Sequence, residues 1–263
     1  MGDLASADSR VILEVSDLTL RFEGISAVSN VSFNVRAGEL FAIIGPNGAG
    51  KTSIFNCLSA VYRPQVGTIR LNGADIVGLS PARAAALGVA RTFQNLGLFM
   101  NLNVIDNLML GRHLRMKTGF FSGALWFGRA HSEEVAHRKR CEEIIELLDL
   151  KNFRLRPAGV LPYGIQKRIE LGRALAMDPV LLLLDEPVAG MNTDETNAMA
   201  GSLLEINRQL GTTMILVEHD IHMVMELAQR ILVVDFGCAI AEGTPEIVGQ
   251  NPKVIEAYLG VAH

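Results

Sequence analysis

Residues 45–52 have the types and spacing of a phosphate-binding loop. They fit the pattern Gly-x-x-x-x-Gly-Lys-Ser/Thr, in which glycines let backbone N–H groups turn toward a phosphate because they tolerate positive φ. Lys51 would contact the terminal phosphates, and the hydroxyl of Thr52 would ligate Mg²⁺. The motif predicts nucleotide binding by Gly45, Pro46, Asn47, Gly48, Ala49, Gly50, Lys51, Thr52 and Ser53.

A second motif places two carboxylates directly after an apolar run. Residues 180–184 are all apolar, and Asp185 and Glu186 follow them. Ligands of α/β sheets bind at the carboxyl ends of the strands. We therefore expect Asp185 to hold Mg²⁺ through its water shell and Glu186 to act as the base that polarises an attacking water. The sequence contains no Asn-Lys-x-Asp motif to recognise guanine, which argues against a GTPase.

The elements that must position these residues are those of an α/β fold. Residues 40–44, 180–184 and 214–217 are continuously apolar, as in strands that are covered on both faces. A helical stretch around residues 198–210 separates the last two runs, and this spacing is typical of a parallel sheet. Residues 31–35 and 67–73 alternate between apolar and polar types, and the second run ends in an Asn-Gly turn. We expect an N-terminal antiparallel β subdomain beside the parallel core.

The middle of the chain has a helical pattern from about Val104 to Asp149. Its clearest apolar positions are spaced i, i+3, i+4, i+7, and Ser132 is the expected N-cap of that helix; the four apolar positions are Cys141, Ile144, Ile145 and Leu148. Asn251 and Pro252 predict the start of a C-terminal helix. The predicted organisation is one domain over residues 11–263. Residues 11–94 and 165–250 form its core, residues 95–164 an inserted α-helical subdomain, and residues 251–263 the C-terminal helix.

Composition and charge exclude several classes of protein. The 263 residues are 49% hydrophobic, but charge-free runs such as residues 40–50 and 92–105 are shorter than the ~18 residues of a membrane span. The net charge of −4 argues against a nucleic-acid partner.

The three cysteines, Cys57, Cys141 and Cys238, form no CxxC pair. We therefore expect their side chains to be small buried hydrophobic groups in a protein of the reducing cytosol.

The series of motifs resembles the ATP-binding subunit of ABC transporters, from about residue 11 to the end. The resemblance implies a P-loop NTPase fold that hydrolyses ATP with Mg²⁺. It also assigns Gln94 to the loop that senses Mg²⁺ and the γ-phosphate, and His219 to the switch histidine on the same phosphate. Phe22 resembles the aromatic residue that stacks on adenine, although the alternating strand around it fits a core aromatic equally well.

Two further motifs of the family occupy their expected places. Residues 161–166 stand where the usual Leu-Ser-Gly-Gly-Gln signature would contact the ATP of an opposite subunit, with Pro162 in place of the serine, Tyr163 in place of a glycine and Ile165 in place of a glutamine. The candidate signature residues are Leu161, Pro162, Tyr163, Gly164, Ile165 and Gln166. The stretch Ala189, Gly190, Met191 and Asn192 resembles the D-loop, with Asn192 in place of the usual aspartate. The lost serine hydroxyl leaves the strength of the contact to the opposite subunit open.

Several stretches are similar to one branch, the larger of the two ATPases of branched-chain amino acid importers. They are residues 92–95, 161–164, 217–220, 223–225 and 251–260, together with the insertion at 117–123. This implies a peripheral protein on the cytoplasmic face of the inner membrane, with transmembrane permease subunits as partners. A second copy or a related ATPase would complete a dimer, and a periplasmic binding protein would act indirectly. The aromatic cluster of Phe120, Phe121, Trp126 and Phe127 marks either a docking surface or a small satellite core.

Other functions within the same resemblance stay open. They are the ATPase of a urea or amide importer, the ATPase of a lipid or polysaccharide exporter, a soluble ABC ATPase of translation or DNA repair, and a regulatory module that binds ATP without hydrolysis. The soluble class usually carries two ATPase units or a long coiled coil, which this chain lacks. The intact Asp185–Glu186 pair argues against the regulatory module. No residue of this chain identifies the transported substrate.

Overall fold

The computed structural model describes residues 10–92, 96–115 and 129–259. Spatial contacts group the chain into two compact units, and each is described by itself. The first unit runs up to Leu87 and resumes at Asn207, and the second comprises Gly88–Ile206. Residues 95–164 lie within the second unit, and the boundaries of the helical subdomain stay a prediction.

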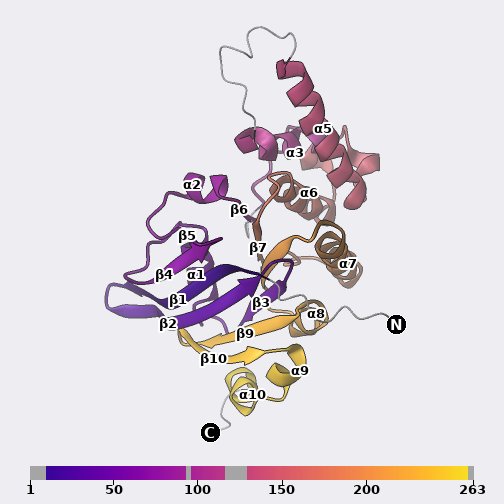
Figure 1. Cartoon of the computed structure of the whole chain (residues 1–263). Coiled ribbons are helices and arrows are strands. Elements are labelled where there is room, and N and C mark those ends of the chain that lie inside the picture. Colours follow the sequence, from indigo (N-terminus) through magenta and orange to yellow (C-terminus); the bar gives the residue numbers. More distant parts are fainter. Residues whose placement is uncertain (1–9, 93–95, 116–128, 260–263) are drawn as a thin grey trace. The chain divides into compact units, whose positions relative to one another are not determined.

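An antiparallel sheet forms the N-terminal part of the first unit. It contains β1 (Val11–Phe22), β2 (Ile25–Arg36), β4 (Val66–Leu71) and β5 (Ala74–Asp75), in the order β2-β1-β4-β5 (Figure 1). The predicted Asn-Gly turn joins β4 to β5, because Asn72 and Gly73 both adopt positive φ, of 50° and 81°. The short helix α2 (Pro81–Ala86) follows, with Ser80 as its N-cap. The predicted antiparallel β subdomain is confirmed.

The first unit also contains three strands that pair in parallel and one that pairs in antiparallel fashion. β3 (Leu40–Ile44) pairs in parallel with both β8 (Thr213–Val217) and β9 (Arg230–Asp235), and β10 (Cys238–Gly243) pairs with β9 in antiparallel fashion. Every residue of β3 and β8 is buried, as their apolar runs predict. Phe33 of β2 stacks on Phe41 of β3 with ring centroids 5.5 Å apart, which joins the two sheets of this unit.

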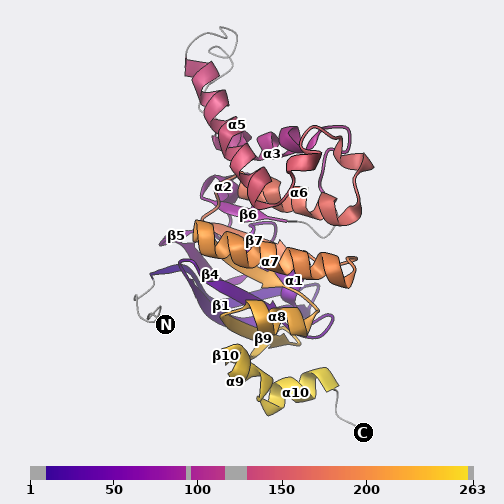
Figure 2. The ribbon, with the colours of Figure 1, turned by 90° about the vertical axis from the view of Figure 1, so that its right-hand side faces the viewer.

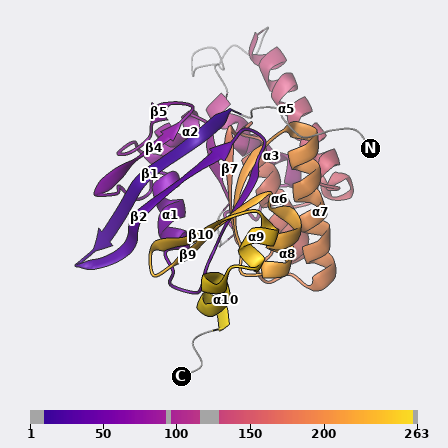
Figure 3. The ribbon, with the colours of Figure 1, turned by 60° about the horizontal axis from the view of Figure 1, so that its bottom comes forward.

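Helices surround these strands. α1 (Lys51–Leu58) follows β3, and α8 (Ile221–Leu227) follows β8. α9 (Pro245–Gly249) and α10 (Pro252–Leu259) lie next to the β9–β10 hairpin (Figure 3). The predicted start of α10 is confirmed, since the Asn251 side chain accepts a hydrogen bond from the N–H of Lys253 at 3.0 Å.

The second unit contains two parallel strands and a group of helices. β6 (Val89–Arg91) pairs with β7 (Leu181–Asp185). α3 (Val104–Arg112), α5 (Arg129–Leu147) and α6 (Tyr163–Leu175) pack against one another (Figure 2). Short 3₁₀ turns cover His113–Arg115, Lys151–Phe153 and Ala158–Val160, and α7 (Thr193–Leu210) extends across the boundary between the units. All four apolar positions predicted for the middle helix are buried.

A group of ion pairs joins these helices. Asp178, after the end of α6, accepts hydrogen bonds from Arg112 of α3 and, at 3.0 Å, from Arg140 of α5. Arg112 also donates to the carbonyl of Ala176 at 2.7 Å. One aspartate therefore links the end of α3 and the middle of α5 to the segment that follows α6.

Two expectations about local structure were wrong. Ser132 does not cap α5, because the helix begins at Arg129, and Arg129 and Ala130 are residues that favour a helix. Cys238 is exposed, whereas Cys57 and Cys141 are buried as expected. Cys238 begins β10 directly after a turn in which Phe236 and Gly237 have positive φ, and its side chain lies at the surface.

Candidate functional site

The predicted phosphate loop connects β3 to α1. The N–H of Ile54 donates to the carbonyl of Gly50 at 3.0 Å, which closes the first turn of the helix. Gly48 and Gly50 have φ of 81° and 103°, values that side chains disfavour. α1 thus begins directly at the loop, so its unbonded N–H groups and helix dipole are available to an anion.

Two glycines of the loop are required by close backbone contacts. A Cβ on Gly45 would lie 2.0 Å from the carbonyl oxygen of Val234, and a Cβ on Gly50 would lie 2.4 Å from that of Ala27. The turn between β9 and β10 adds a support, because the N–H of Gly237 donates to the carbonyl of Ala49 at 3.0 Å. The loop is therefore held by β2 and by the β9–β10 hairpin, which the sequence pattern did not indicate.

Lys51 and Thr52 stand at the first turn of α1. Lys51 is buried, and its Nζ donates to the carbonyls of Gly45 at 2.7 Å and Pro46 at 3.0 Å. Its ammonium group is thereby placed inside the curve of the loop. Thr52 is exposed and Ser53 is partly exposed. The backbone and side chains of this segment present one cation, several N–H groups and hydroxyl groups to a ligand.

Two other candidate residues of the first unit follow its strands. β3 and β8 are in register at Ile43 and Val217, so His219 emerges at the same edge of the sheet as the phosphate loop. His219 is exposed, and its N–H donates to the carboxylate of the buried Glu218 at 3.1 Å. Phe22, at the end of β1, is 43% exposed, so it is not a core aromatic. Its ring meets that of Tyr62 edge-on, with centroids 5.2 Å apart.

The carboxylates of the second motif end β7, as predicted. Asp185 is buried and forms an ion pair with Arg91 of β6, with Nη2 and Oδ2 2.6 Å apart. The hydroxyl of Thr92 accepts a hydrogen bond from the N–H of Asp185 at 3.3 Å. Sequence reasoning gave Arg91 no role, because the contact depends on the pairing of two strands that are 94 positions apart at these residues. The buried carboxylate therefore has a cationic partner on the neighbouring strand.

Glu186 occupies a turn that leads into the D-loop residues. It has a φ of 48°, which is uncommon for a residue with a side chain. The N–H of Ala189 donates to its carbonyl at 3.2 Å and closes the turn. Asn192 then caps α7 reciprocally: its side chain accepts from the N–H of Glu195 at 3.0 Å, and Glu195 accepts from the N–H of Asn192 at 3.2 Å. The asparagine in place of the usual aspartate thus has a structural role.

The signature residues surround the start of α6. Leu161 is buried, and its carbonyl accepts a hydrogen bond from the Gln166 side chain at 2.9 Å. Pro162 is the N-cap and supplies no side-chain hydrogen bond to the first turn. Gly164 is buried against α7, since a Cβ there would lie 2.6 Å from Oε1 of Glu195. The Tyr163 hydroxyl donates to the carbonyl of Ala189 at 3.1 Å, so the signature contacts the D-loop residues of the same chain.

Some predicted residues lie outside the described ranges. These are Gln94 and the aromatic cluster of Phe120, Phe121, Trp126 and Phe127. Their roles stay predictions.

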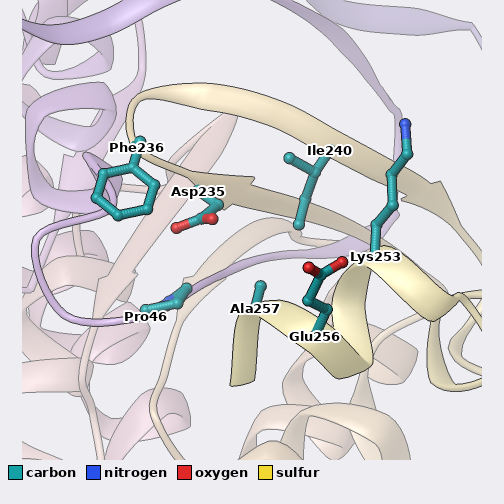
Figure 4. Close-up of a pocket in the computed structure, with 7 residues that line it drawn as sticks. All are labelled: Pro46, Asp235, Phe236, Ile240, Lys253, Glu256 and Ala257. Atoms are coloured by element: carbon teal, nitrogen blue, oxygen red, sulfur yellow. The ribbon is translucent and has the colours of Figure 1, made fainter. Parts of the chain in front are cut away.

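A pocket of about 630 Å³ lies beside the phosphate loop in the first unit. Figure 4 shows the β9–β10 hairpin on one side of it and α10 on the other. Its lining residues are Pro46, Asp235, Phe236, Ile240, Lys253, Glu256 and Ala257. Tyr258 of α10 reaches the phosphate loop itself. Burial raises the pKa of its hydroxyl to about 12, and a hydrogen bond with the backbone of Gly45 partly opposes this rise. The C-terminal helix is therefore part of the support of the loop, a role that sequence reasoning missed.

The chemistry available to these groups is phosphate binding and proton transfer. Within the described ranges, no cluster of three or more histidine, cysteine or acidic side chains could hold a metal ion. In the same ranges, no helix has the length and apolar character needed to cross a membrane.

Comparisons with known proteins agree with this chemistry. The family described as "ABC transporter" matches residues 28–189, and "Branched-chain amino acid ATP-binding cassette transporter" matches residues 240–263. The chain is 44% identical to the high-affinity branched-chain amino acid transport ATP-binding protein LivG of Salmonella typhimurium, across 97% of this chain and 100% of that protein. It is 41% identical to the corresponding protein BraF of Pseudomonas aeruginosa over the same shares of both chains.

Solved structures give the same result for the fold. A crystal structure of the ADP conformation of an ATP-binding cassette of an ABC transporter superposes with a TM-score of 0.82 at 27% identity, and covers 96% of this chain and 100% of its own. A nucleotide-free cassette superposes with a TM-score of 0.81 at 28% identity, over 95% of this chain and 100% of its own. The predicted α/β P-loop NTPase fold is confirmed.

Proposed function

The chain belongs to the ATP-binding proteins of ABC transporters, and from this premise we propose that it powers the import of branched-chain amino acids through membrane permease subunits. Its catalytic activity is the hydrolysis of ATP. The observation that carries the proposal is the phosphate loop, in which Gly45 and Gly50 meet neighbouring backbone so closely that only glycine fits. The full-length similarity to LivG and BraF supports the choice of substrate.

The loop and the first turn of α1 would bind the phosphates of ATP. Backbone N–H groups between Gly45 and Ser53 would donate to phosphate oxygens, and Lys51 would supply a positive charge to the terminal phosphates. Phe22, which is exposed, would offer its ring to adenine. His219 and Gln94 would contact the γ-phosphate.

Mg²⁺ is the metal that fits the available donors. Thr52 would ligate it through its hydroxyl, and Asp185 would hold it through water, with Gln94 as a further oxygen ligand. Bound there, the ion would neutralise charge on the transferred phosphoryl group. In the structure the carboxylate of Asp185 pairs with Arg91 of β6.

Glu186 would accept a proton from the attacking water. The signature residues 161–166 would contact ATP bound to the opposite subunit, with the N-terminus of α6 toward its phosphate. That subunit is a second copy or a related ATPase, so ATP would close a dimer and hydrolysis would open it. Located on the cytoplasmic face of the membrane, the dimer would drive the permeases, to which a periplasmic binding protein delivers the substrate.

Glu186→Gln tests the proposal directly. The variant should bind ATP, accumulate as a dimer and lose turnover by about 10²- to 10⁴-fold, the usual contribution of a general base. Glu146→Gln is the matched control, because its side chain is 78% exposed on α5 and the same change there should leave turnover unaltered. Near-normal hydrolysis by Glu186→Gln would remove Glu186 from the role of base.

The transported substrate needs a second experiment. The chain reconstituted in vesicles with candidate permeases, its partner ATPase and a leucine-binding protein should hydrolyse ATP faster when leucine is added. Stimulation by urea or an amide, with no response to leucine, would overturn the proposed substrate and leave the ATPase activity in place.

A further inference from the structure

Tyr163 links two segments that the proposed function uses for different purposes. It is the first residue of α6 and lies in the signature, yet its hydroxyl donates to the carbonyl of Ala189 in the D-loop at 3.1 Å. Its ring lies against Gly190, where an added Cβ would be 3.3 Å from Cε1 of the ring. The glycine expected at position 163 in the family could make neither contact.

The contacted turn is the one that carries Glu186. The N–H of Ala189 donates to the carbonyl of Glu186 at 3.2 Å, while the carbonyl of Ala189 accepts from Tyr163. Glu186 has a φ of 48°, and residues with side chains keep such a conformation only where their surroundings hold it. Two hydrogen bonds in series therefore connect the Tyr163 hydroxyl to the backbone of the candidate base.

The other side of Tyr163 is anchored within the helix. Nζ of Lys167 lies 6.0 Å from the centroid of the ring, at the outer limit of a cation–π contact. Lys167 and Glu170 form an ion pair with an N–O distance of 3.6 Å, and each side chain is only 2% exposed. Oε1 of Glu170 accepts from the N–H of Gly97 at 3.4 Å. The tyrosine thus extends from a fixed part of α6 to the turn at Glu186.

We propose that Tyr163 is a positioning residue for Glu186, which it aligns through the carbonyl of Ala189. The inference rests on the proposed function, in which Glu186 is the base and residues 161–166 contact the opposite subunit's ATP. Closure of the dimer against that ATP would then affect the position of Glu186 in the same chain. The reason is that Tyr163 belongs to the signature and also supports the turn at Glu186. The sequence departure at position 163 couples dimer closure to hydrolysis.

Tyr163→Phe tests the proposal, since it removes only the hydroxyl. It should lower kcat by about 2- to 10-fold, the range for loss of one hydrogen bond, and leave KM for ATP unchanged. The matched control is Ser202→Ala, which removes a hydroxyl that donates to the carbonyl of Ala198 at 2.9 Å within α7. That control should leave kcat unaltered. An unchanged kcat in Tyr163→Phe, or a raised KM with an unchanged kcat, would overturn the proposal.

A double mutant distinguishes a positioning role for Tyr163 from general destabilisation of the protein. In a Glu186→Gln background the base is already absent, so adding Tyr163→Phe should cause no further loss of the residual turnover. An equal fold-loss in both backgrounds would show that Tyr163 acts elsewhere and would overturn the inference.

Hydrogen exchange separates this inference from the proposed function. In the nucleotide-free full-length protein, the amide of Ala189 should exchange about 2- to 10-fold faster in Tyr163→Phe than in wild type. Unchanged exchange would overturn the positioning role even if the wild type hydrolyses ATP as proposed. If the wild type binds ATP without hydrolysing it, the proposed function is overturned. The positioning of a base is then overturned too, even if the Ala189 amide exchanges faster in Tyr163→Phe.

Discussion

Gly50→Ala is the substitution whose effect follows most directly from the geometry of the phosphate loop. Gly50 has a φ of 103°, and a Cβ there would lie 2.4 Å from the carbonyl oxygen of Ala27 and 3.5 Å from Cα of Gly237. Both neighbours are backbone atoms, so neither can turn away as a flexible side chain would. The loop must therefore move away from β2 and from the β9–β10 hairpin.

The size of the effect has two sources. Placing a side chain in the left-handed region costs about 1–2 kcal/mol. Moving the loop also strains the hydrogen bond from the N–H of Gly237 to the carbonyl of Ala49, and loss of one such bond costs about 1 kcal/mol. We expect the free energy of unfolding to fall by about 2–3 kcal/mol. Displacement of the loop should also weaken ATP binding by about tenfold or more, which corresponds to about 1.4 kcal/mol.

Two glycines provide controls in which backbone strain acts alone. Gly48 has a φ of 81° and a Cβ there would meet nothing within 4 Å. Gly38, in the turn between β2 and β3, has a φ of 73° and only an ordinary contact of 3.7 Å. Gly48→Ala and Gly38→Ala should each lower the free energy of unfolding by about 1–2 kcal/mol. Gly38→Ala should leave ATP affinity unchanged.

The assay combines urea unfolding, followed by circular dichroism, with titration of a fluorescent ATP analogue. Gly50→Ala should lose more stability than the two controls and more affinity than Gly38→Ala. If all three variants lose the same stability and retain the same affinity, the close approach of Gly50 to the Ala27 carbonyl does not hold the loop in place.

The remaining predictions concern a carboxylate and the three cysteines. Burial alone would raise the pKa of Asp178, but hydrogen bonds from Arg112 and Arg140 more than offset it, so the pKa lies below its usual value. Ionised Asp178 therefore stabilises the fold above about pH 4, and this stability is lost as the pH falls through its lower folded pKa. The difference in urea-unfolding free energy between wild type and Asp178→Asn should shrink from about pH 6 to about pH 3; a constant difference would contradict it. Burial raises the pKa of the Cys57 thiol to about 12 and that of Cys141 to about 11, whereas Cys238 is exposed. Iodoacetamide at about pH 7.5 should thus add one group to the native protein, at Cys238, and mass spectrometry that finds two or three adducts would contradict this assignment.

The strands that carry the site could be predicted from the sequence because their environment demands it. Residues 40–44 and 214–217 are buried on both faces in β3 and β8, and only apolar residues satisfy that environment. The Asn-Gly turn at positions 72 and 73 was equally predictable, since both residues adopt positive φ. The start of α5 was not, because Ser132 has the residue type of a cap while the favourable residues before it continue the helix to Arg129.

The contacts that complete the site required the three-dimensional structure. The ion pair of Arg91 with Asp185 depends on the register of β6 against β7, and a single sequence contains no local sign of that register. The same holds for Tyr258, which is near Gly45 only because α10 packs beside the β9–β10 hairpin. Motif residues are fixed by the local geometry of a loop, and so they were predictable. Their supports depend on tertiary packing, and so they were not.

The altered signature shows how a departure from a motif can be compensated within one chain. Pro162 removes the hydroxyl that a serine would offer to an opposite nucleotide, and it gives the first turn of α6 no side-chain cap. Tyr163 brings a hydroxyl to the next position, but this hydroxyl is directed to Ala189 of its own chain. Contact with the opposite phosphate would then rest on backbone N–H groups of the helix, which any residue but proline supplies. The side chain of Tyr163 is then not needed for the opposite phosphate and can support Glu186. Pro162 and Tyr163, the two departures from the usual signature, are therefore compatible with each other.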